Sequence, residues 1–271
     1  MALSPETTPD TADGDALAVW LLALGQTLGF ACLYYVFAAL LPAWEEAFGW
    51  SKASLAAGPT LAIVISAVIA PFAGRLVDRG LGGELLWGGA LWGGLALAAL
   101  ALVESHGQYL LAWAAIGLGH GTSLYEVCFA FLTRRLGSGA RGAIIRVTLV
   151  AGFASTLAFP MGAMLAEAFG WRWAVAGFAA LSLCLSAPAN GWAVARLRRL
   201  ERRGPGCLAA SPRGGAFRAA LRRPEFWLLA LVYGALSLNH STLVAFALPL
   251  FASVGAGSAL AITAASCVGP A

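Results

Sequence analysis

Polar residues inside long apolar runs are the first candidates for chemistry in this sequence. Glu126 lies in an apolar stretch about eight residues, or roughly 12 Å of helix, before Arg134. A carboxylate at that depth is costly and marks a functional site by default, because it can bind a proton or a cationic group. Gly119, Thr122, Ser123 and Glu126 share one face of a continuous helix, so we expect Glu126 to point into a bundle. A structural hydrogen bond to a neighbouring helix is the alternative.

Three further polar residues sit at comparable positions. Gln26 lies about ten residues into the first apolar run, at a depth similar to that of Glu126. Asn239 and His240 interrupt a later apolar run, and an imidazole can exchange protons near neutral pH. A lone histidine is also commonly a packing residue, so both interpretations of His240 stay open. His120 falls on a different helical face from Glu126 and is interpreted as structural.

The turn from Gly74 to Gly80 is a charged break between two apolar runs. Asp78 and Arg79 supply an acidic and a basic group within it, and Gly74 would allow two helices to approach closely. These residues fit an ion-pair network between helices. They also fit a solvated turn in which Asp78 caps a helix end.

The composition assigns the chain to a membrane environment. Hydrophobic residues make up 60% of the sequence and charged residues 11%, against about 25% charged residues in soluble domains. A soluble protein this apolar could not cover its surface, and the ten tryptophans fit an interfacial belt. We therefore predict an all-α fold, a polytopic membrane helix bundle.

Seven apolar runs have the length of about 20 residues that a membrane helix needs, and an eighth begins near residue 258. The seven are 16–42, 53–73, 84–103, 108–133, 143–166, 173–195 and 226–252. They predict a tail (1–15, disordered), a six-helix N-terminal half (16–195), a basic linker (196–224) and the start of a second half (225–271). The tail contains no Lys or Arg, so no cleavable signal peptide is expected.

Basic residues are distributed unevenly between alternate loops. Segments 74–84, 134–146 and 196–223 hold two, four and nine of them, which is fifteen of the 17 in the chain. Lys52 and Arg172 are left for the other side. Because cytoplasmic loops are enriched in Lys and Arg, these three segments and the N-terminus are predicted to be cytoplasmic.

Enzymatic, metal-binding and nucleic-acid-binding classes find little support. The three histidines are far apart, the five cysteines have no paired spacing, and we find no Ser/His/Asp constellation, phosphate loop or metal-ligand motif. The basic clusters lack interleaved aromatic residues, so their topological role is preferred over nucleic-acid binding. No enzyme activity, cofactor, metal or nucleic-acid partner is expected.

The charged turn resembles the signature of the major facilitator superfamily, a Gly-x-Leu-Ala-Asp-Arg-x-Gly-Arg-Lys-like segment between the second and third helices. The residues that match in place and spacing are Gly74, Leu76, Asp78 and Arg79. The sequence departs from the pattern where the closing basic pair would fall, at Gly82 and Gly83. Other stretches look like the bacterial monocarboxylate-transporter-type branch, namely Phe48–Lys52, Leu124–Glu126, Gly170–Arg172 and Gly269–Ala271.

This resemblance implies a secondary transporter of the bacterial cytoplasmic membrane that moves a small organic solute by alternating access, with protons as a candidate coupling ion. It implies that Gly74, Asp78 and Arg79 belong to a gate, and that helices 1, 4, 7 and 10 line the cavity. The candidate solute or proton contacts are then Gln26, Tyr125, Glu126, Asn239 and His240.

Members of that family have twelve helices, whereas this sequence ends within an eighth. We therefore expect a fragment or an early-terminated reading frame. An inactive truncated product and a non-transporting membrane receptor or scaffold are the alternatives to a transporter.

Overall fold

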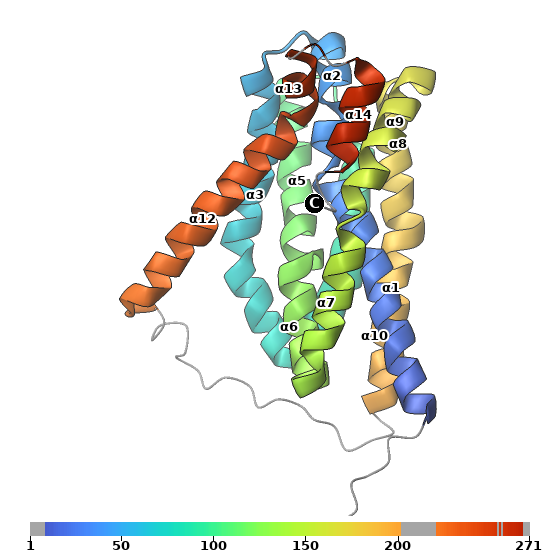
Figure 1. Cartoon of the computed structure of the whole chain (residues 1–271), viewed down its shortest axis with the longest axis vertical. Helices are drawn as coiled ribbons and strands as arrows, with labels where there is room; N and C mark the ends of the chain where they lie inside the picture. Colours follow the sequence, from blue (N-terminus) through green and yellow to red (C-terminus); the bar gives the residue numbers. More distant parts are fainter. Residues whose placement is uncertain (1–8, 202–220, 254, 256, 268–271) are drawn as a thin grey trace, which may run out of the picture.

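The computed structural model describes residues 9–201, 221–253, 255 and 257–267. This part of the chain is helical and contains no strand, which confirms the all-α membrane bundle (Figure 1). Its α-helices are α1 (Pro9–Leu33), α2 (Val36–Phe48), α3 (Lys52–Leu76), α4 (Gly82–Leu100), α5 (His106–Ser123), α6 (Tyr125–Leu136), α7 (Ala140–Ala151), α8 (Ala154–Phe169), α9 (Trp171–Leu181), α10 (Ala187–Glu201), α12 (Pro224–Ala245), α13 (Ala247–Ser253) and α14 (Ser258–Ser266). Three short segments join them, the π-helices η1 (Val77–Leu81) and η3 (Ser182–Ser186) and the 3-10 helix η2 (Gly137–Gly139).

The helices follow the predicted apolar runs, with two differences at the N-terminus. The first run was predicted to end at residue 42, but α2 continues to Phe48 and ends where Gly49 takes a left-handed φ of 63°. The second difference is that α1 begins at Pro9, inside the segment 1–15 that was predicted to be disordered. Proline is favoured in the first turn of a helix. Residues 1–8, and residues 202–220 of the linker, lie outside the described part.

Long apolar stretches fold back at glycines. Residues Lys52–Leu100 and His106–Phe169 are each apolar enough to cross a membrane and too long to cross it once, at 49 and 64 residues. The first reverses at η1, where Gly80 has a φ of 91°, and the second at Gly137, with a φ of 52°. A positive φ is readily adopted by glycine, so these two residues set the reversals.

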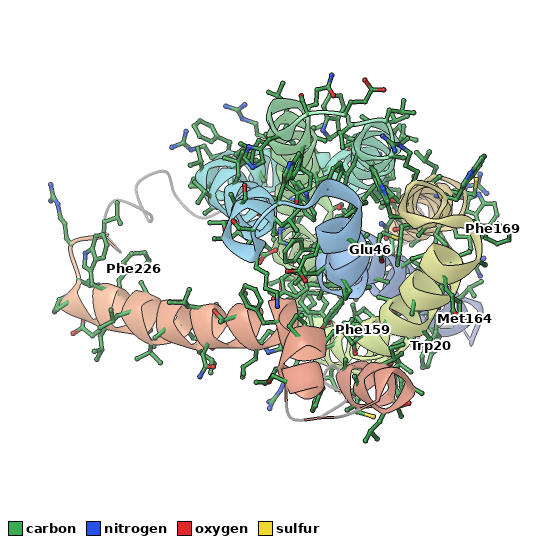
Figure 2. All side chains as sticks on the ribbon, turned by 90° about the horizontal axis from the view of Figure 1, so that it is seen from above. Trp20, Glu46, Phe159, Met164, Phe169 and Phe226 are labelled. Atoms are coloured by element: carbon green, nitrogen blue, oxygen red, sulfur yellow. The ribbon has the colours of Figure 1, made fainter. Side chains whose placement is uncertain are left out.

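The reversals place most basic turns at one end of the bundle, here called the basic end. It carries the α3–α4 turn, the α6–α7 turn and the end of α10 (Figure 1). The opposite end, here called the far end, carries the α2–α3 connection, α13 and α14 (Figure 1). Seen along the bundle, α12 extends away from the other helices, with Phe226 near its tip (Figure 2).

Small residues bring α5 against its neighbours. A Cβ added to Gly119 would lie 2.8 Å from the Cα of Gly93 in α4. One added to Gly117 would lie 2.6 Å from the backbone oxygen of Ala62 in α3. Close backbone approach through small residues is the usual packing mode of membrane helices, where apolarity alone does not favour burial. These contacts pack α5 closely against both α3 and α4.

The predicted helix 108–133 is broken near its middle. Leu124 has an extended backbone, with φ −90° and ψ −162°, so α5 ends at Ser123 and α6 begins at Tyr125. The face from Gly119 to Glu126 that the sequence analysis assumed to be continuous is therefore interrupted, and that part of the expectation was wrong. The break changes the direction of the side chains that follow it.

Candidate binding cavity

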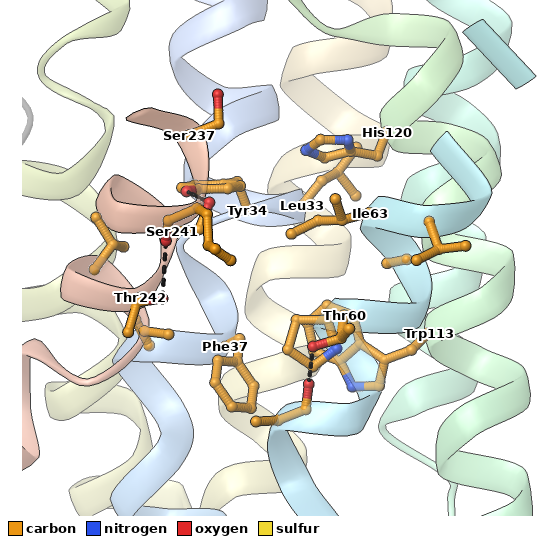
Figure 3. Close-up of a pocket in the computed structure, with 18 of the residues that line it drawn as sticks. Leu33, Tyr34, Phe37, Thr60, Ile63, Trp113, His120, Ser237, Ser241 and Thr242 are labelled. Carbon is orange, nitrogen blue, oxygen red and sulfur yellow. Dashed lines mark hydrogen bonds between the residues drawn. The ribbon is translucent and has the colours of Figure 1, made fainter. Parts of the chain in front are cut away.

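A cavity of about 440 Å³ lies between α1–α2, α3, α5 and α12 (Figure 3). Its volume is within the range of small-molecule sites. The lining consists mostly of apolar side chains with a few polar ones. The residues are Leu33, Tyr34, Phe37, Ala38, Ala56, Pro59, Thr60, Ala62, Ile63, Val64, Trp113, His120, Gly234, Ser237, Leu238, Ser241, Thr242, Val244, Ala245 and Phe246.

The α12 side of the cavity is one helical stripe. Gly234, Ser237, Ser241 and Ala245 recur at three- or four-residue intervals and therefore lie on one face. These residues are small or carry a hydroxyl group, so the stripe offers space and hydrogen-bonding groups together.

Two of the lining hydroxyl groups are satisfied within their own helices. Thr60 donates to the Ala56 carbonyl and Thr242 to the Leu238 carbonyl, both at 2.8 Å. Such bonds to the preceding turn are typical of threonine in helices. The hydroxyl groups of Tyr34 and Ser241 instead pair with each other at 3.0 Å (Figure 3). This hydrogen bond joins the break between α1 and α2 to α12 across the cavity.

His120 reaches into the cavity from α5 (Figure 3). Its ring stacks against Tyr34, with 6.1 Å between the ring centroids and 29° between the planes. Its Nδ1 lies 3.2 Å from the Ser66 hydroxyl oxygen in α3, while its Nε2 is buried without a hydrogen-bond partner among the described residues. Trp113, which also lines the cavity, has a buried Nε1 without a hydrogen-bond partner among the described residues. Two lining residues, His120 and Trp113, therefore each carry a buried ring nitrogen that is left without a partner.

Gln26 is fully buried and lies outside the cavity lining. Its Nε2 donates to the Ser123 carbonyl at 2.8 Å. That carbonyl belongs to the last turn of α5, where helix ends leave backbone oxygens without a helical partner. The structure thus places Gln26 as the side chain that stabilises the α5–α6 break.

Tyr125 and Glu126 open α6 directly after the break, and neither belongs to the lining. Tyr125 packs on Phe129, with ring centroids 4.7 Å apart, and on Phe30, at 4.3 Å. Glu126 is exposed in the first turn of α6. Gln26 contacts the break from one side and Tyr125 follows it on the other, so these sequence candidates gather around the break.

Asn239 and His240 are exposed on α12 and lie off the lining stripe. Sequence reasoning selected the most polar residues of this run, whereas the cavity uses the smaller ones beside them, Ser237 and Ser241. The spacing of those serines with Gly234 was the signal that could have found them. The interpretation of His120 as structural depended on a continuous helix that carries His120 and Glu126 on different faces, but this helix breaks at Leu124 between them.

At the basic end, Asp78 and Arg79 are exposed and form no ion pair with another described residue. Gly74 does not support the expected close approach, since a Cβ there would meet nothing within 4 Å. The close approach is at Gly83, where a Cβ would lie 2.3 Å from Val194 of α10. An ion pair that the sequence analysis missed lies beside it, Arg198 to Glu84 at 2.5 Å.

Glycine therefore stands at Gly83, where the family signature has a basic residue, because α10 occupies the space. Glu84 and Arg198 supply charge beside this position. Glu84 follows Gly83 in α4, and Arg198 lies one turn after Val194 in α10.

Comparison with known families places these features in context. The family model of the Major Facilitator Superfamily matches residues 19–270, which is most of the chain and includes the cavity and the charged turn. Searches of curated proteins and of solved structures returned no match. With its multi-pass apolar helices and this match, the chain belongs to the major facilitator superfamily of membrane transporters.

Proposed function

We propose that this protein is a secondary transporter that moves a small organic solute across the bacterial cytoplasmic membrane by alternating access. The observation that carries the proposal is the cavity, because its walls come from two parts of the chain. Helices α1–α2, α3 and α5 form one wall, and α12, the first helix after the linker, forms the other. A solute between two separately connected walls can be exposed to either side as one wall moves against the other.

The packing of α12 supports a state that is open toward the basic end. α12 contacts α2 and α13, and among its described residues Val244, near its C-terminal end, is buried. Most of the preceding residues are exposed, and Figure 2 shows this part of α12 leaving the bundle. The distribution of fifteen of the 17 basic residues supports assigning that end and the N-terminus to the cytoplasm.

Protons are the proposed coupling ion, with Glu126 as the proton site. Glu126 is the carboxylate of the first turn of α6, and its side chain is exposed beside the α5–α6 break. The turn with Gly74, Asp78 and Arg79 is proposed as part of the gate at the basic end. Its exposed charges are free to pair in a second conformation.

The test measures uptake of radiolabelled neutral, anionic and cationic small organic solutes into proteoliposomes. Gly234 lines the cavity and Gly88 in α4 does not, and an added Cβ meets nothing within 4 Å at either glycine. Gly234→Phe is expected to fill the cavity and to reduce protein-dependent uptake about tenfold or more, whereas Gly88→Phe is expected to leave uptake unchanged. Equal uptake by both variants would show that solute does not pass through this cavity.

Uptake into the same proteoliposomes distinguishes a transporter from a receptor or scaffold. A receptor or scaffold would bind a solute without protein-dependent flux, and that result would exclude transport. If Glu126 couples protons, Glu126→Gln will abolish the dependence of uptake on an imposed pH gradient. Unchanged uptake with unchanged pH dependence would remove Glu126 from the coupling mechanism.

A further inference from the structure

We infer that His120 is the polar anchor of the cavity and that it binds an uncharged amphiphilic solute through Nε2. This inference rests on the proposed function and names the chemistry of its solute. Its starting point is that a buried nitrogen without a hydrogen-bond partner is destabilising, because it has lost its bonds to water without gaining others. Nε2 of His120 has no such partner among the described residues, and His120 is part of the lining of a cavity large enough for a ligand.

The ring is held in place by the bundle, so Nε2 has a defined position. Nδ1 faces the Ser66 hydroxyl oxygen at 3.2 Å, and the ring stacks on Tyr34. A hydroxyl group can donate or accept, so Ser66 is compatible with either neutral tautomer of the imidazole. Nε2 can therefore accept from a ligand hydroxyl group or donate to a ligand carbonyl group.

The surroundings of His120 disfavour a charged ligand. The elements that face it contribute Ser66 from α3, Tyr34 from the α1–α2 break, and Ser237 and Ser241 from α12. The cavity lining contains no Asp, Glu, Lys or Arg among the described residues. An ion moved from water into such a site loses its hydration without gaining a counter-ion, which costs far more than burying a hydrogen-bonded neutral group.

The remaining lining specifies the other end of the ligand. Phe37, Ile63 and Phe246 present apolar surface to the cavity, and Trp113 adds its ring. The imidazole and the hydroxyl groups of Tyr34 and α12 therefore meet one end of the bound molecule. The rest meets mainly aromatic and aliphatic side chains, with the Thr60 hydroxyl group bonded within its own helix and Trp113 Nε1 as a second possible donor. A small molecule with an apolar body and one neutral hydrogen-bonding head group matches this division.

The first experiment uses three probes that share a phenyl body, 2-phenylethanol, phenylacetate and 2-phenylethylammonium. Imidazole nitrogen resonances are recorded in protein labelled with ¹⁵N-histidine in nanodiscs at pH 8, and the chain has three histidines. We expect the alcohol to shift the His120 Nε2 signal saturably, with an affinity about tenfold or more above that of either ion. His240, exposed on α12, reports nonspecific partitioning into lipid.

Two substitutions test whether Nε2, rather than the histidine ring as a whole, binds the ligand. His120→Asn retains an amide near Nδ1 that can still face Ser66, whereas His120→Gln carries an amide out to the place of Nε2. Calorimetric titration of 2-phenylethanol should give an affinity about tenfold lower for His120→Asn and within about threefold of the parent for His120→Gln. Because both variants replace the same buried ring, loss of packing alone would weaken them equally.

Several outcomes would overturn the inference. They are tighter binding of phenylacetate or 2-phenylethylammonium than of the alcohol, unchanged binding by His120→Asn, and no shift of His120 by any probe. The flux assay keeps this inference separate from the proposed function. Binding at His120 without protein-dependent flux would refute transport but not the role of His120 in binding. Flux of the transported solute that is unchanged in His120→Asn would refute the role of His120 but not transport.

Discussion

The α1–α2 span and α12 both line the cavity, yet they pack in opposite ways. In the apolar stretch Ala16–Phe48, 61% of an 18-residue apolar segment is buried inside the protein, against 6% of such a segment in Pro224–Ala245. Both stretches are apolar enough to cross a membrane. Lipid solvates apolar side chains as well as a protein interior does, so apolarity does not select which helix is enclosed.

Close contact between backbones, rather than apolarity, distinguishes the enclosed helices from α12. Where helices of the N-terminal bundle meet closely, glycine lies against backbone, as at Gly117 against Ala62 and Gly119 against Gly93. On α12, a Cβ added to Gly234 meets no atom of the described residues within 4 Å. The cavity therefore has a fixed wall, made by α1–α2, α3 and α5, and a loosely held wall, made by α12. Alternating access requires such a pair of walls.

The largest expected effect is on the fixed wall. Gly119→Ala forces a methyl group to within 2.8 Å of the Gly93 backbone, and backbone cannot swing aside as a side chain can. We expect it to lower the free energy of unfolding by about 2–3 kcal/mol. Gly234→Ala on α12 should instead raise it by about 0.5–1 kcal/mol, because alanine is the better helix former. Thermal unfolding of both variants in the same detergent measures the contrast. Equal stability would mean that the walls do not differ in packing.

A smaller effect is expected where the two walls touch. Tyr34→Phe removes the hydroxyl group that pairs with Ser241, a hydrogen bond worth about 0.5–1.5 kcal/mol. We expect this to change the ratio of α12 conformers about two- to twelvefold. Spin labels at Arg79 and Trp227, in a background with the cysteines replaced by serine, report that ratio as a distance distribution.

Tyr35→Phe is the matched control, since the Tyr35 hydroxyl group forms no hydrogen bond with another described residue. If Tyr34→Phe and Tyr35→Phe give the same distribution, the hydrogen bond does not hold the loosely packed wall in place.

The smallest effect is expected at the Glu84–Arg198 ion pair, which joins α4 to α10 behind the cavity walls. The side chains are 42% and 34% exposed, so screening limits the pair to about 1 kcal/mol or less. Glu84→Gln should lower the midpoint of thermal unfolding by a few degrees at most, and 1 M salt should remove the difference. Glu45→Gln, which loses the 3.8 Å contact to Lys52, provides the comparison at the far end. A loss of stability as large as that of Gly119→Ala would show that charge, rather than close packing, holds the N-terminal helices together.

Much of the fold was predictable because its signals are local. Run lengths identified the membrane helices, and Gly80 marked a reversal that the structure places at η1 with a φ of 91°. Helix ends were less predictable. The run through Glu45 and Glu46 continues to Gly49, and the stretch around Leu124 is as apolar as a continuous helix although it breaks.

The candidate site was less predictable for a related reason. Polarity and depth selected Gln26 and His240, but the structure places Gln26 on the Ser123 carbonyl and leaves His240 exposed. Polarity shows that a residue needs a partner and does not show which neighbour provides it. His120 entered the site through contacts with Ser66 and Tyr34, which lie more than 50 residues away in the sequence.

By itself, the sequence determined that this chain lies in a membrane, that a charged turn separates two of its apolar helices, and that this turn has the form found in one transporter superfamily. These properties follow from composition and from backbone preferences of neighbouring residues, which need no knowledge of the fold. Only the tertiary structure decided which helix faces enclose the cavity, that Gly83 rather than Gly74 admits a neighbouring helix, and that His120 is left with a buried nitrogen without a partner. Those outcomes depend on backbone-to-backbone distances between helices, and in lipid such distances are set by the shapes of both partners.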